Sequence, residues 1–209
     1  MPLTIRTVIK VFLFGFYFHA ALYAQDTVVP NPNFQKAMAA YHAGNYNGAM
    51  VSLVLALENE PANPQLYYYY GNCYFIQNEN KEAMKNFNRA IELNPQYSEA
   101  YKSRGKLKAR MHDYRGSVDD FDRAIQLNPE FSDAFFNRGL SYFNLREYKR
   151  SVADFTTVIS FNPKDYEAYY TRGNANYAMG NKEQGCKDWS KAAELGYFSA
   201  YDLIKMKCD

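Results

Sequence analysis

The feature that most constrains the fold of this 209-residue chain is a sequence period of 34 residues. Four separate columns of residues keep this step, and each column holds one kind of side chain. They are a proline column (Pro61, Pro95, Pro129, Pro163), a glycine column led by Ala37 (Gly71, Gly105, Gly139, Gly173), an aromatic column led by Leu53 (Phe87, Phe121, Phe155, Trp189) and a small or aliphatic column (Ala56, Ala90, Ala124, Val158, Ala192). Such agreement predicts an array of similar structural units.

Within each unit the apolar residues have helical spacing. An i, i+3, i+4, i+7 pattern marks one face of a helix in both halves of the unit, as in Tyr67, Tyr70, Gly71 and Tyr74. A polar turn separates the two halves, and an Asn-Pro or Glu-Pro pair closes each of the first four units, since proline cannot continue a helix. Each unit is therefore expected to be an antiparallel helical hairpin. One hairpin cannot bury its apolar face alone, so neighbouring hairpins must stack.

With these columns in place, the chain resembles the tetratricopeptide repeat family over residues 30–196. The resemblance implies an all-α fold, a right-handed α-solenoid of five hairpins in units 30–63, 64–97, 98–131, 132–165 and 166–196. Residues 197–209 are expected to form a C-terminal capping helix. Proteins of this family mostly mediate protein–protein contacts, and their partners vary.

The N-terminal segment has the pattern of an export signal. Arg6 and Lys10 precede an uncharged run, residues 11–24, which is shorter than the roughly 20 residues of a membrane-spanning helix. The run ends in Ala24, a small residue, and polar residues follow. We expect a signal peptide over residues 1–24, cleaved near Ala24, and a linker over residues 25–29, so that the protein is exported to a bacterial periplasm or cell envelope. The alternative is an uncleaved anchor, which would be the chain's one attachment to a membrane.

Composition and motifs argue against several classes of function. The chain has 24 Lys and Arg against 22 Asp and Glu, and the two basic residues of the predicted signal account for the excess, so no basic surface for nucleic acid is expected. A phosphate-binding glycine loop, a zinc-protease motif and a nucleophile elbow are all missing from the sequence. His42 and His112 are expected at the surface near helix ends. We therefore predict a non-enzymatic chain without cofactor or metal.

Three units share a pair of opposite charges. Arginine precedes the column glycine, and aspartate precedes the column aromatic 16 residues later; the pairs are Arg104 with Asp120, Arg138 with Asp154, and Arg172 with Asp188. In the other two units both positions lack the charge pair, so the two residue types occur together or not at all. We predict structural ion pairs, partly buried, between the two helices of a hairpin or between adjacent hairpins.

The cysteines suggest a disulfide at the C-terminal end. Residues 198–207 are expected to form a helix with Ala200, Leu203 and Ile204 on one face. Cys186 precedes the expected turn at Gly196 by about the same distance as Cys208 follows it, so antiparallel helices would bring the two thiols together. In an oxidising compartment we expect them to be bonded; the alternative is two free thiols. Cys73 is expected to be a buried, unreactive thiol.

A second stripe on the first helix of each unit is the candidate partner-binding groove, because in the tetratricopeptide repeat family this stripe lines the concave surface. It comprises Phe34, Met38, Tyr41; Tyr68, Asn72, Phe75; Lys102, Lys106, Ala109; Phe136, Leu140, Phe143; Tyr170, Asn174, Tyr177. Arg110 adds to the two lysines, so we expect an aromatic trough with a basic centre, suited to an extended peptide with apolar side chains and a central acid. The alternative is that these aromatic residues pack across neighbouring hairpins. The clamp that some family members use for a chaperone C-terminus is not matched, since Asp133 stands where a lysine belongs.

We therefore predict a protein–protein interaction adaptor or scaffold of the cell envelope, with a peptide or protein partner. Two other functions remain open. One is a periplasmic holdase chaperone that uses the aromatic trough for many clients. The other is an envelope glycan-binding module that stacks sugars on Tyr68, Phe136 and Tyr170.

Overall fold

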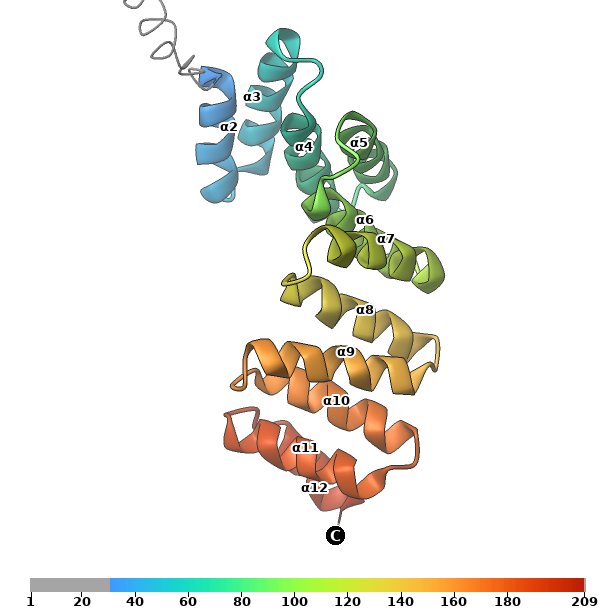
Figure 1. Cartoon of the computed structure of the whole chain (residues 1–209). Coiled ribbons are helices and arrows are strands. Elements are labelled where there is room, and N and C mark those ends of the chain that lie inside the picture. Colours follow the sequence, from blue (N-terminus) through green and yellow to red (C-terminus); the bar gives the residue numbers. More distant parts are fainter. Residues whose placement is uncertain (1–30, 209) are drawn as a thin grey trace, which may run out of the picture.

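The computed structural model describes residues 31–208, which form helices joined by short turns, without a strand in that range (Figure 1). The predicted signal peptide (1–24) and linker (25–29) lie outside the described residues. The helices are α2 (Pro32–His42), α3 (Tyr46–Asn59), α4 (Pro64–Ile76), α5 (Asn80–Leu93), α6 (Ser98–Arg110), α7 (Tyr114–Leu127), α8 (Ser132–Asn144), α9 (Tyr148–Phe161), α10 (Tyr166–Ala178), α11 (Lys182–Glu194) and α12 (Ala200–Lys207).

The helices pair into five hairpins that stack into an α-solenoid. Pairs α2–α3, α4–α5, α6–α7, α8–α9 and α10–α11 form the hairpins, and each helix packs chiefly on the helices before and after it in the chain. The first helices of units two to five begin at Pro64, Ser98, Ser132 and Tyr166, at the unit boundaries expected from the sequence period. The hairpins follow one another from α2 at one end to α12 at the other (Figure 1).

The turn inside each hairpin repeats one backbone conformation. A residue with positive φ occurs at the same place in all five units: Gly44 (74°), Asn78 (63°), His112 (64°), Arg146 (63°) and Gly180 (96°). Glycine adopts this left-handed conformation without steric cost, and asparagine or histidine with little. His112 is therefore an exposed turn residue, with its Nδ1 2.9 Å from the Tyr114 hydroxyl.

The core of each hairpin is the contact between the glycine column and the aromatic column. A Cβ atom on Gly105 would lie 2.9 Å from the Phe121 ring, and one on Gly173 would lie 2.6 Å from Trp189. Both aromatic side chains are buried, as are Phe87 and Phe155 at the equivalent positions. The glycines are required because the ring of the second helix lies against the backbone of the first.

The three repeated arginines form ion pairs and hydrogen bonds that join three helices each. Arg138 on α8 donates two hydrogen bonds to Asp154 on α9, Nε at 2.8 Å and Nη2 at 2.6 Å, and its Nη1 lies 2.6 Å from Asp122 on α7. Arg104 and Arg172 bind Asp120 and Asp188 with the same two atoms; their Nη1 atoms donate to further acceptors, Asn88 and Thr156. Each arginine thus connects the two helices of its own hairpin and the second helix of the preceding hairpin.

The surroundings of the three aspartates differ. Lys108 lies 2.8 Å from Asp120 as a second cation, and Asp188 also accepts hydrogen bonds from Asn176 and Gln184. Within residues 31–208, Arg138 is the one hydrogen-bonding partner of the Asp154 carboxylate. Burial raises the pKa of Asp154, although the neighbouring Arg138 guanidinium acts in the opposite direction. The fourth unit therefore has the fewest cations and hydrogen-bond donors around its buried aspartate.

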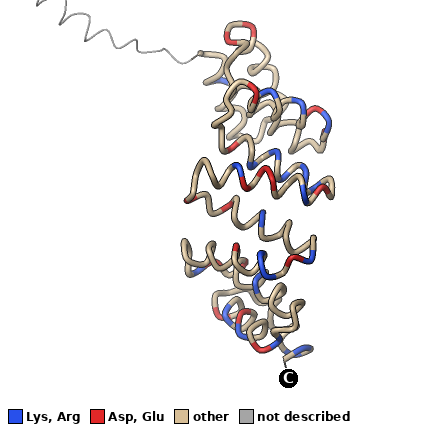
Figure 2. Tube along the Cα trace, turned by 45° about the vertical axis from the view of Figure 1, so that its right-hand side comes forward, with Lys and Arg blue, Asp and Glu red and all other residues tan. Residues whose placement is uncertain are grey.

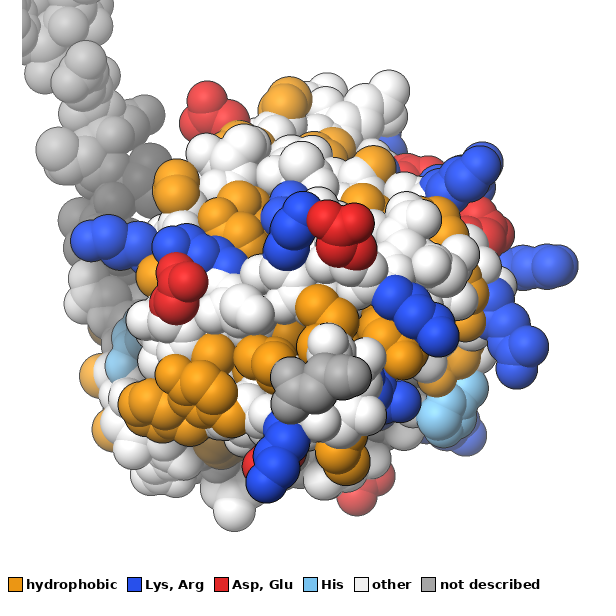
Figure 3. All heavy atoms as spheres, turned by 90° about the horizontal axis from the view of Figure 1, so that it is seen from below, with side chains coloured by type: hydrophobic (Ala, Val, Ile, Leu, Met, Phe, Trp, Pro, Cys, Tyr) orange, Lys and Arg blue, Asp and Glu red, His pale blue; other side chains and the backbone are white. Residues whose placement is uncertain are grey.

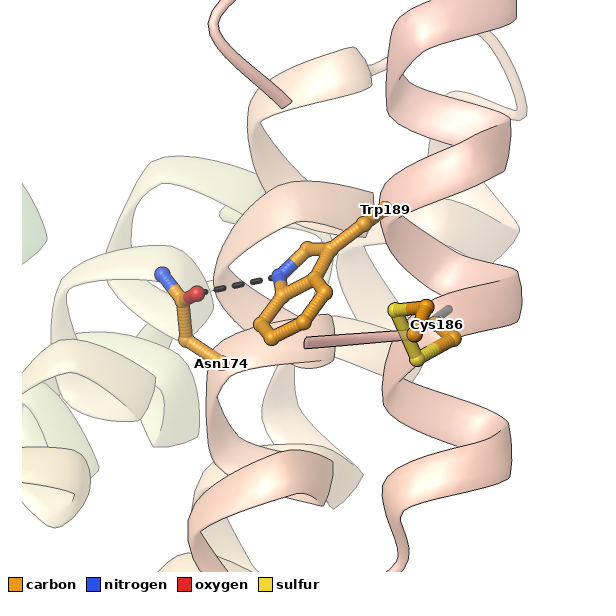
Figure 4. The surroundings of a disulfide bond; sticks show 4 residues. Asn174, Cys186 and Trp189 are labelled. Carbon is orange, nitrogen blue, oxygen red and sulfur yellow. Dashed lines mark hydrogen bonds between the residues drawn. A yellow bond between two sulfur atoms is a disulfide. The ribbon is translucent and has the colours of Figure 1, made fainter. Parts of the chain in front are cut away.

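The C-terminal helix α12 is fixed to α11 by a covalent bond. The Sγ atoms of Cys186 and Cys208 are 2.04 Å apart, so the two residues form a disulfide (Figure 4). Ala200 is fully buried against the last hairpin, and Leu203 and Ile204 pack there half-buried. Cys73 is a buried free thiol, and burial raises its pKa to about 11, so it is protonated and unreactive at neutral pH.

Three further properties concern the described residues as a whole. Basic and acidic residues are interspersed along the solenoid instead of forming separate faces (Figure 2). None of the helices between residues 31 and 208 has the length and apolar character needed to cross a lipid bilayer. Over the same range, His, Cys, Asp and Glu side chains nowhere gather in threes in a way that could hold a metal ion.

Candidate partner-binding site

Six of the predicted groove residues line one hollow on the first helices of units one to three. Its volume is about 250 Å³, and α2, α4 and α6 supply its walls. The spacing i, i+4, i+7 on α4 and i, i+4 on α6 places these side chains on one face of each helix. The lining residues are Tyr41, Tyr68, Asn72, Phe75, Ile76, Lys102, Ser103 and Lys106. Below, we call this set the N-terminal hollow.

The aromatic wall of the N-terminal hollow is supported from behind by residues that the groove prediction missed. The Tyr69 ring lies 5.4 Å from that of Tyr41 and 5.0 Å from that of Tyr68, and the Tyr97 ring lies 5.1 Å from Tyr68. Tyr97 has an equivalent one period later, Phe131, which lies under Lys102. This pair of aromatic residues at a step of 34 was the signal that could have revealed the supporting layer.

The hydroxyls of Tyr41, Tyr69 and Tyr97 stay protonated at neutral pH. Burial raises the pKa of Tyr41 to about 12 and also raises the pKa values of Tyr69 and Tyr97. A neutral phenol presents a hydrogen-bond donor together with an apolar ring. The wall is therefore suited to contact an apolar side chain and, at the same time, a polar group of a peptide.

The opposite wall carries two lysines whose charge is partly balanced. The Nζ atom of Lys102 lies 3.0 Å from the Asp133 carboxylate on α8, and the Nζ atom of Lys106 lies 3.9 Å from the same oxygen. Lys106 and Asp133 remain about two-fifths exposed, so this contact is open to solvent and to competing ions. Two ammonium groups and one carboxylate leave a single net positive charge, which is less than the basic centre expected from the sequence.

Arg110 does not belong to the N-terminal hollow. Its guanidinium stacks on the Phe75 ring, 3.8 Å from the centroid, and donates hydrogen bonds to the Phe75 carbonyl and to Asn78 Oδ1 at 2.8 and 3.1 Å. It also donates to Asn80 Oδ1. Arg110 is the last residue of α6, beside the α4–α5 turn, and it therefore joins unit three to unit two. Arg110 is therefore not among the residues that line the hollow.

Beyond unit three, the predicted stripe packs against the protein itself. Phe136 contacts Phe155, and Tyr170 contacts Tyr197, with ring centroids 5.4 and 4.6 Å apart. Asn174 accepts a hydrogen bond of 3.0 Å from Trp189 Nε1 (Figure 4). Two more members in these units have aromatic neighbours as well: Phe143 lies beside Tyr148, and Tyr177 is stacked on Trp189. Phe34, in unit one, lies beside Tyr69. In units four and five the alternative of packing between elements describes the structure better than a groove.

A larger and shallower hollow lies beside the ion pairs of units three and four. Its volume is about 610 Å³, and its lining includes Asp122, Arg138, Tyr142, Arg150 and Asp154. Arg138 is bound to both aspartates, and Arg150 pairs with Glu147 at 2.8 Å. Because these charges are bound to one another, the N-terminal hollow is the better candidate for a partner.

The chain matches two protein-family models and several solved structures. The models are described as "TPR repeat", over residues 71–111, and "Tetratricopeptide repeat", over residues 103–159. No curated protein matches the chain. A crystal structure of the MamA protein is 23% identical, with a TM-score of 0.71, and the match covers 78% of this chain and 89% of that one.

Two further structures have the same fold. MamA from Desulfovibrio magneticus RS-1, from residue 41 to its end, is 15% identical, with a TM-score of 0.73 and coverage of 78% of this chain and 92% of that one. YrrB, described as a TPR protein with an unusual peptide-binding site, is 21% identical, with a TM-score of 0.73 and coverage of 90% and 97%. The family models, the period and the stacked hairpins agree. Residues 71–159 therefore contain tetratricopeptide repeats, and the hairpins on either side of them have the same architecture.

Proposed function

We propose that this protein is a non-enzymatic interaction scaffold that binds a peptide segment of a partner protein in the N-terminal hollow. The observation that carries the proposal is the convergence of three helices on one hollow with an aromatic wall and a lysine wall. Proteins of the same fold support it, since YrrB is described as having a peptide-binding site. At about 250 Å³ the hollow is smaller than the ~300–1,000 Å³ of typical small-molecule sites, which favours a short stretch of an extended chain.

The two walls of the hollow select the chemistry of the bound segment. The rings of Tyr41, Tyr68 and Phe75 favour an apolar or aromatic side chain. Lys102 and Lys106 favour a carboxylate next to it, which would compete with Asp133 for the two ammonium groups. The expected ligand is therefore a peptide in which an acidic residue or a C-terminal carboxylate adjoins an apolar residue.

A capture experiment tests this proposal. The wild-type chain and a Lys102→Glu/Lys106→Glu variant are used to recover partners from a cell-envelope fraction, and the proteins recovered are identified by mass spectrometry. We expect the variant to lose the partners that the wild type recovers, because two acidic side chains beside Asp133 repel a carboxylate. Asp133→Asn should instead increase their recovery, since it leaves both lysines available.

The matched control is Lys81→Glu/Lys85→Glu on α5. These two lysines are exposed and have the same i, i+4 spacing and the same change of charge, but they lie outside the hollow. The control should recover the same partners as the wild type. Equal recovery by all four proteins would contradict the proposed site, and equal loss in both double variants would indicate only a long-range charge effect.

The structure gives less support to the two other functions. A glycan platform on Tyr68, Phe136 and Tyr170 requires free ring faces, whereas Phe136 and Tyr170 pack against Phe155 and Tyr197. A holdase needs a broad apolar surface for unrelated clients. The N-terminal hollow is small and carries polar groups on one wall, so it favours a specific segment.

We propose further that the chain is exported to the cell envelope. The N-terminal pattern of a basic start and a short apolar run supports this, and so does the disulfide, because such bonds persist mainly in oxidising compartments. Mass spectrometry of the protein isolated from the periplasmic fraction should find an N-terminus at Gln25. Recovery of a form that still contains Arg6 and Lys10 would contradict cleavage.

A further inference from the structure

The last helix and the turn before it present apolar side chains to solvent on the side that points away from the solenoid. Phe198, Tyr201 and Met206 are 74%, 55% and 70% exposed. A helix that only shields the end of a repeat array is polar on its outer face. Viewed from this end of the molecule, apolar side chains instead form patches between charged ones (Figure 3). Exposed apolar groups gathered on one element mark an interaction surface.

This surface is held in place before any partner arrives. The disulfide fixes the end of α12 to α11, and Ala200 is fully buried beneath its beginning. The rings of Phe198 and Tyr201 are stacked, with an interplanar angle of 12°. A preformed surface loses little conformational entropy on binding.

The charges on the outer face of α12 complement a second copy of the same helix. Asp202 and Lys205 are exposed on the same side as Tyr201 and Met206, and between residues 31 and 208 neither has an ion-pair partner. Suppose that two copies of α12 lie antiparallel about a two-fold axis that passes between Leu203 and Ile204. Residue 202 of one copy then lies opposite residue 205 of the other, and residue 201 opposite residue 206. The helix is thus self-complementary in charge and in apolar contacts, as a two-fold interface requires.

We propose that a second copy of this chain docks on α12 and forms a two-fold symmetric dimer. Asp202 pairs with the partner's Lys205, and the Tyr201 ring packs on the partner's Met206. Because the interface has two-fold symmetry, each of these contacts occurs twice. Aromatic rings and methionine sulfur attract each other, and the paired charges fix the antiparallel direction. Phe198 extends the apolar contact at the beginning of the helix.

The small size of this surface determines how tightly the two copies are expected to bind each other. Stable interfaces bury roughly 800 Å² on each partner, and the outer face of an eight-residue helix is smaller than that. The dimer should therefore be weak and depend on concentration. It leaves the N-terminal hollow at the other end of the solenoid free, so a dimer offers two hollows to a partner with repeated segments. This inference does not depend on the proposed function of the hollow.

Exchange of the two charges tests the dimer. Sedimentation velocity across a wide range of concentrations is measured for the full chain and for Asp202→Lys, Lys205→Asp and the double variant. Each single variant places like charges opposite each other twice, so its dissociation constant should rise about tenfold. The double variant restores both ion pairs with the charges reversed and should dimerise like the wild type. Asp119→Lys, a charge reversal of an exposed residue on α7, is the control and should leave the association unchanged.

The outcomes separate clearly. Loss of the dimer in both single variants and recovery in the double variant support the proposed interface. A wild type that stays monomeric at every concentration overturns it, as does a double variant that is as weak as the single ones. Association that none of the exchanges alters also overturns it, because the contact must then lie elsewhere. Far-UV circular dichroism of each variant shows that the fold is intact, since all exchanged side chains are exposed.

Discussion

Replacing Arg138 by leucine should lower the stability of the protein by about 3–5 kcal/mol, the usual cost of removing one partner from a buried ion pair. Arg138 and Asp154 are both largely buried, with side chains 18% and 6% exposed, and the leucine leaves the aspartate charge without a donor. Thermal and urea denaturation, followed by circular dichroism, measure the loss. An unchanged or higher melting temperature would show that the pair does not stabilise the fold.

Two comparisons make this prediction specific. Arg104→Leu and Arg172→Leu should cost less, because Asp120 keeps Lys108 and Asp188 keeps two amide donors. In an Arg138→Leu/Asp154→Asn variant, much of the lost stability should return, since the buried charge is removed as well. If the three single arginine variants lose the same amount, the remaining donors do not compensate and this ranking is wrong.

The same variant should also show a distinct pH dependence. Burial already raises the pKa of Asp154, and removal of the arginine raises it further above its value in the unfolded chain. A carboxyl whose folded-state pKa is raised destabilises the fold above that pKa and ceases to do so when it is protonated. The stability difference between wild type and Arg138→Leu should therefore be largest at neutral pH and shrink as the solution is acidified. A difference that is constant with pH would argue against an unpaired Asp154.

The second large effect concerns the disulfide. Cys208→Ser should lower the stability of the C-terminal end by about 3 kcal/mol, the chain-entropy estimate for a loop closed over a separation of 22 residues. Trp189 is the single tryptophan of the chain and lies in the cluster against which α12 packs, so its fluorescence reports on this end. We expect the fluorescence midpoint in urea to fall more than the circular dichroism midpoint, because stability in repeat arrays is local.

Reduction provides the control for this prediction. Dithiothreitol should change the wild type in the same way as Cys208→Ser and should have no further effect on the variant. A thiol count on the denatured, unreduced protein should find one free thiol, that of Cys73. Three free thiols would show that the bond does not form in the cell.

The sequence was sufficient for the repeated parts of the fold because each of them appears several times. The period of 34 located the start of α4, α6, α8 and α10, and the glycine and aromatic columns were found in direct contact. The Arg–Asp contacts could be inferred because arginine and aspartate occur together in three units and in no other. The second acceptor of each arginine was missed: Asn88, Asp122 and Thr156 stand at one period, but they share only the ability to accept a hydrogen bond.

The candidate site was harder to predict because it depends on how side chains choose between neighbours. Six stripe residues converge on the N-terminal hollow, but four others pack on the protein itself, because Phe155, Trp189 and Tyr197 offer them a contact. Asp133 enters the site from the next unit and reduces its charge. Arg110 turns towards the α4–α5 turn instead of the two lysines. Such choices depend on distances between units, which a residue pattern does not contain.

The arginine that joins three helices also determines how such an array can grow. The third and fourth units each bring an arginine, the aspartate that receives it, and an acceptor for the arginine of the unit that follows. A duplicated copy of residues 132–165, inserted next to the original, would find every one of these partners already in place. The first unit has Val54 at the acceptor position, so a copy of it inserted before unit three would leave Arg104 without its third contact. A unit placed before an arginine-bearing unit must therefore carry a hydrogen-bond acceptor at this position, as the second unit does with Asn88.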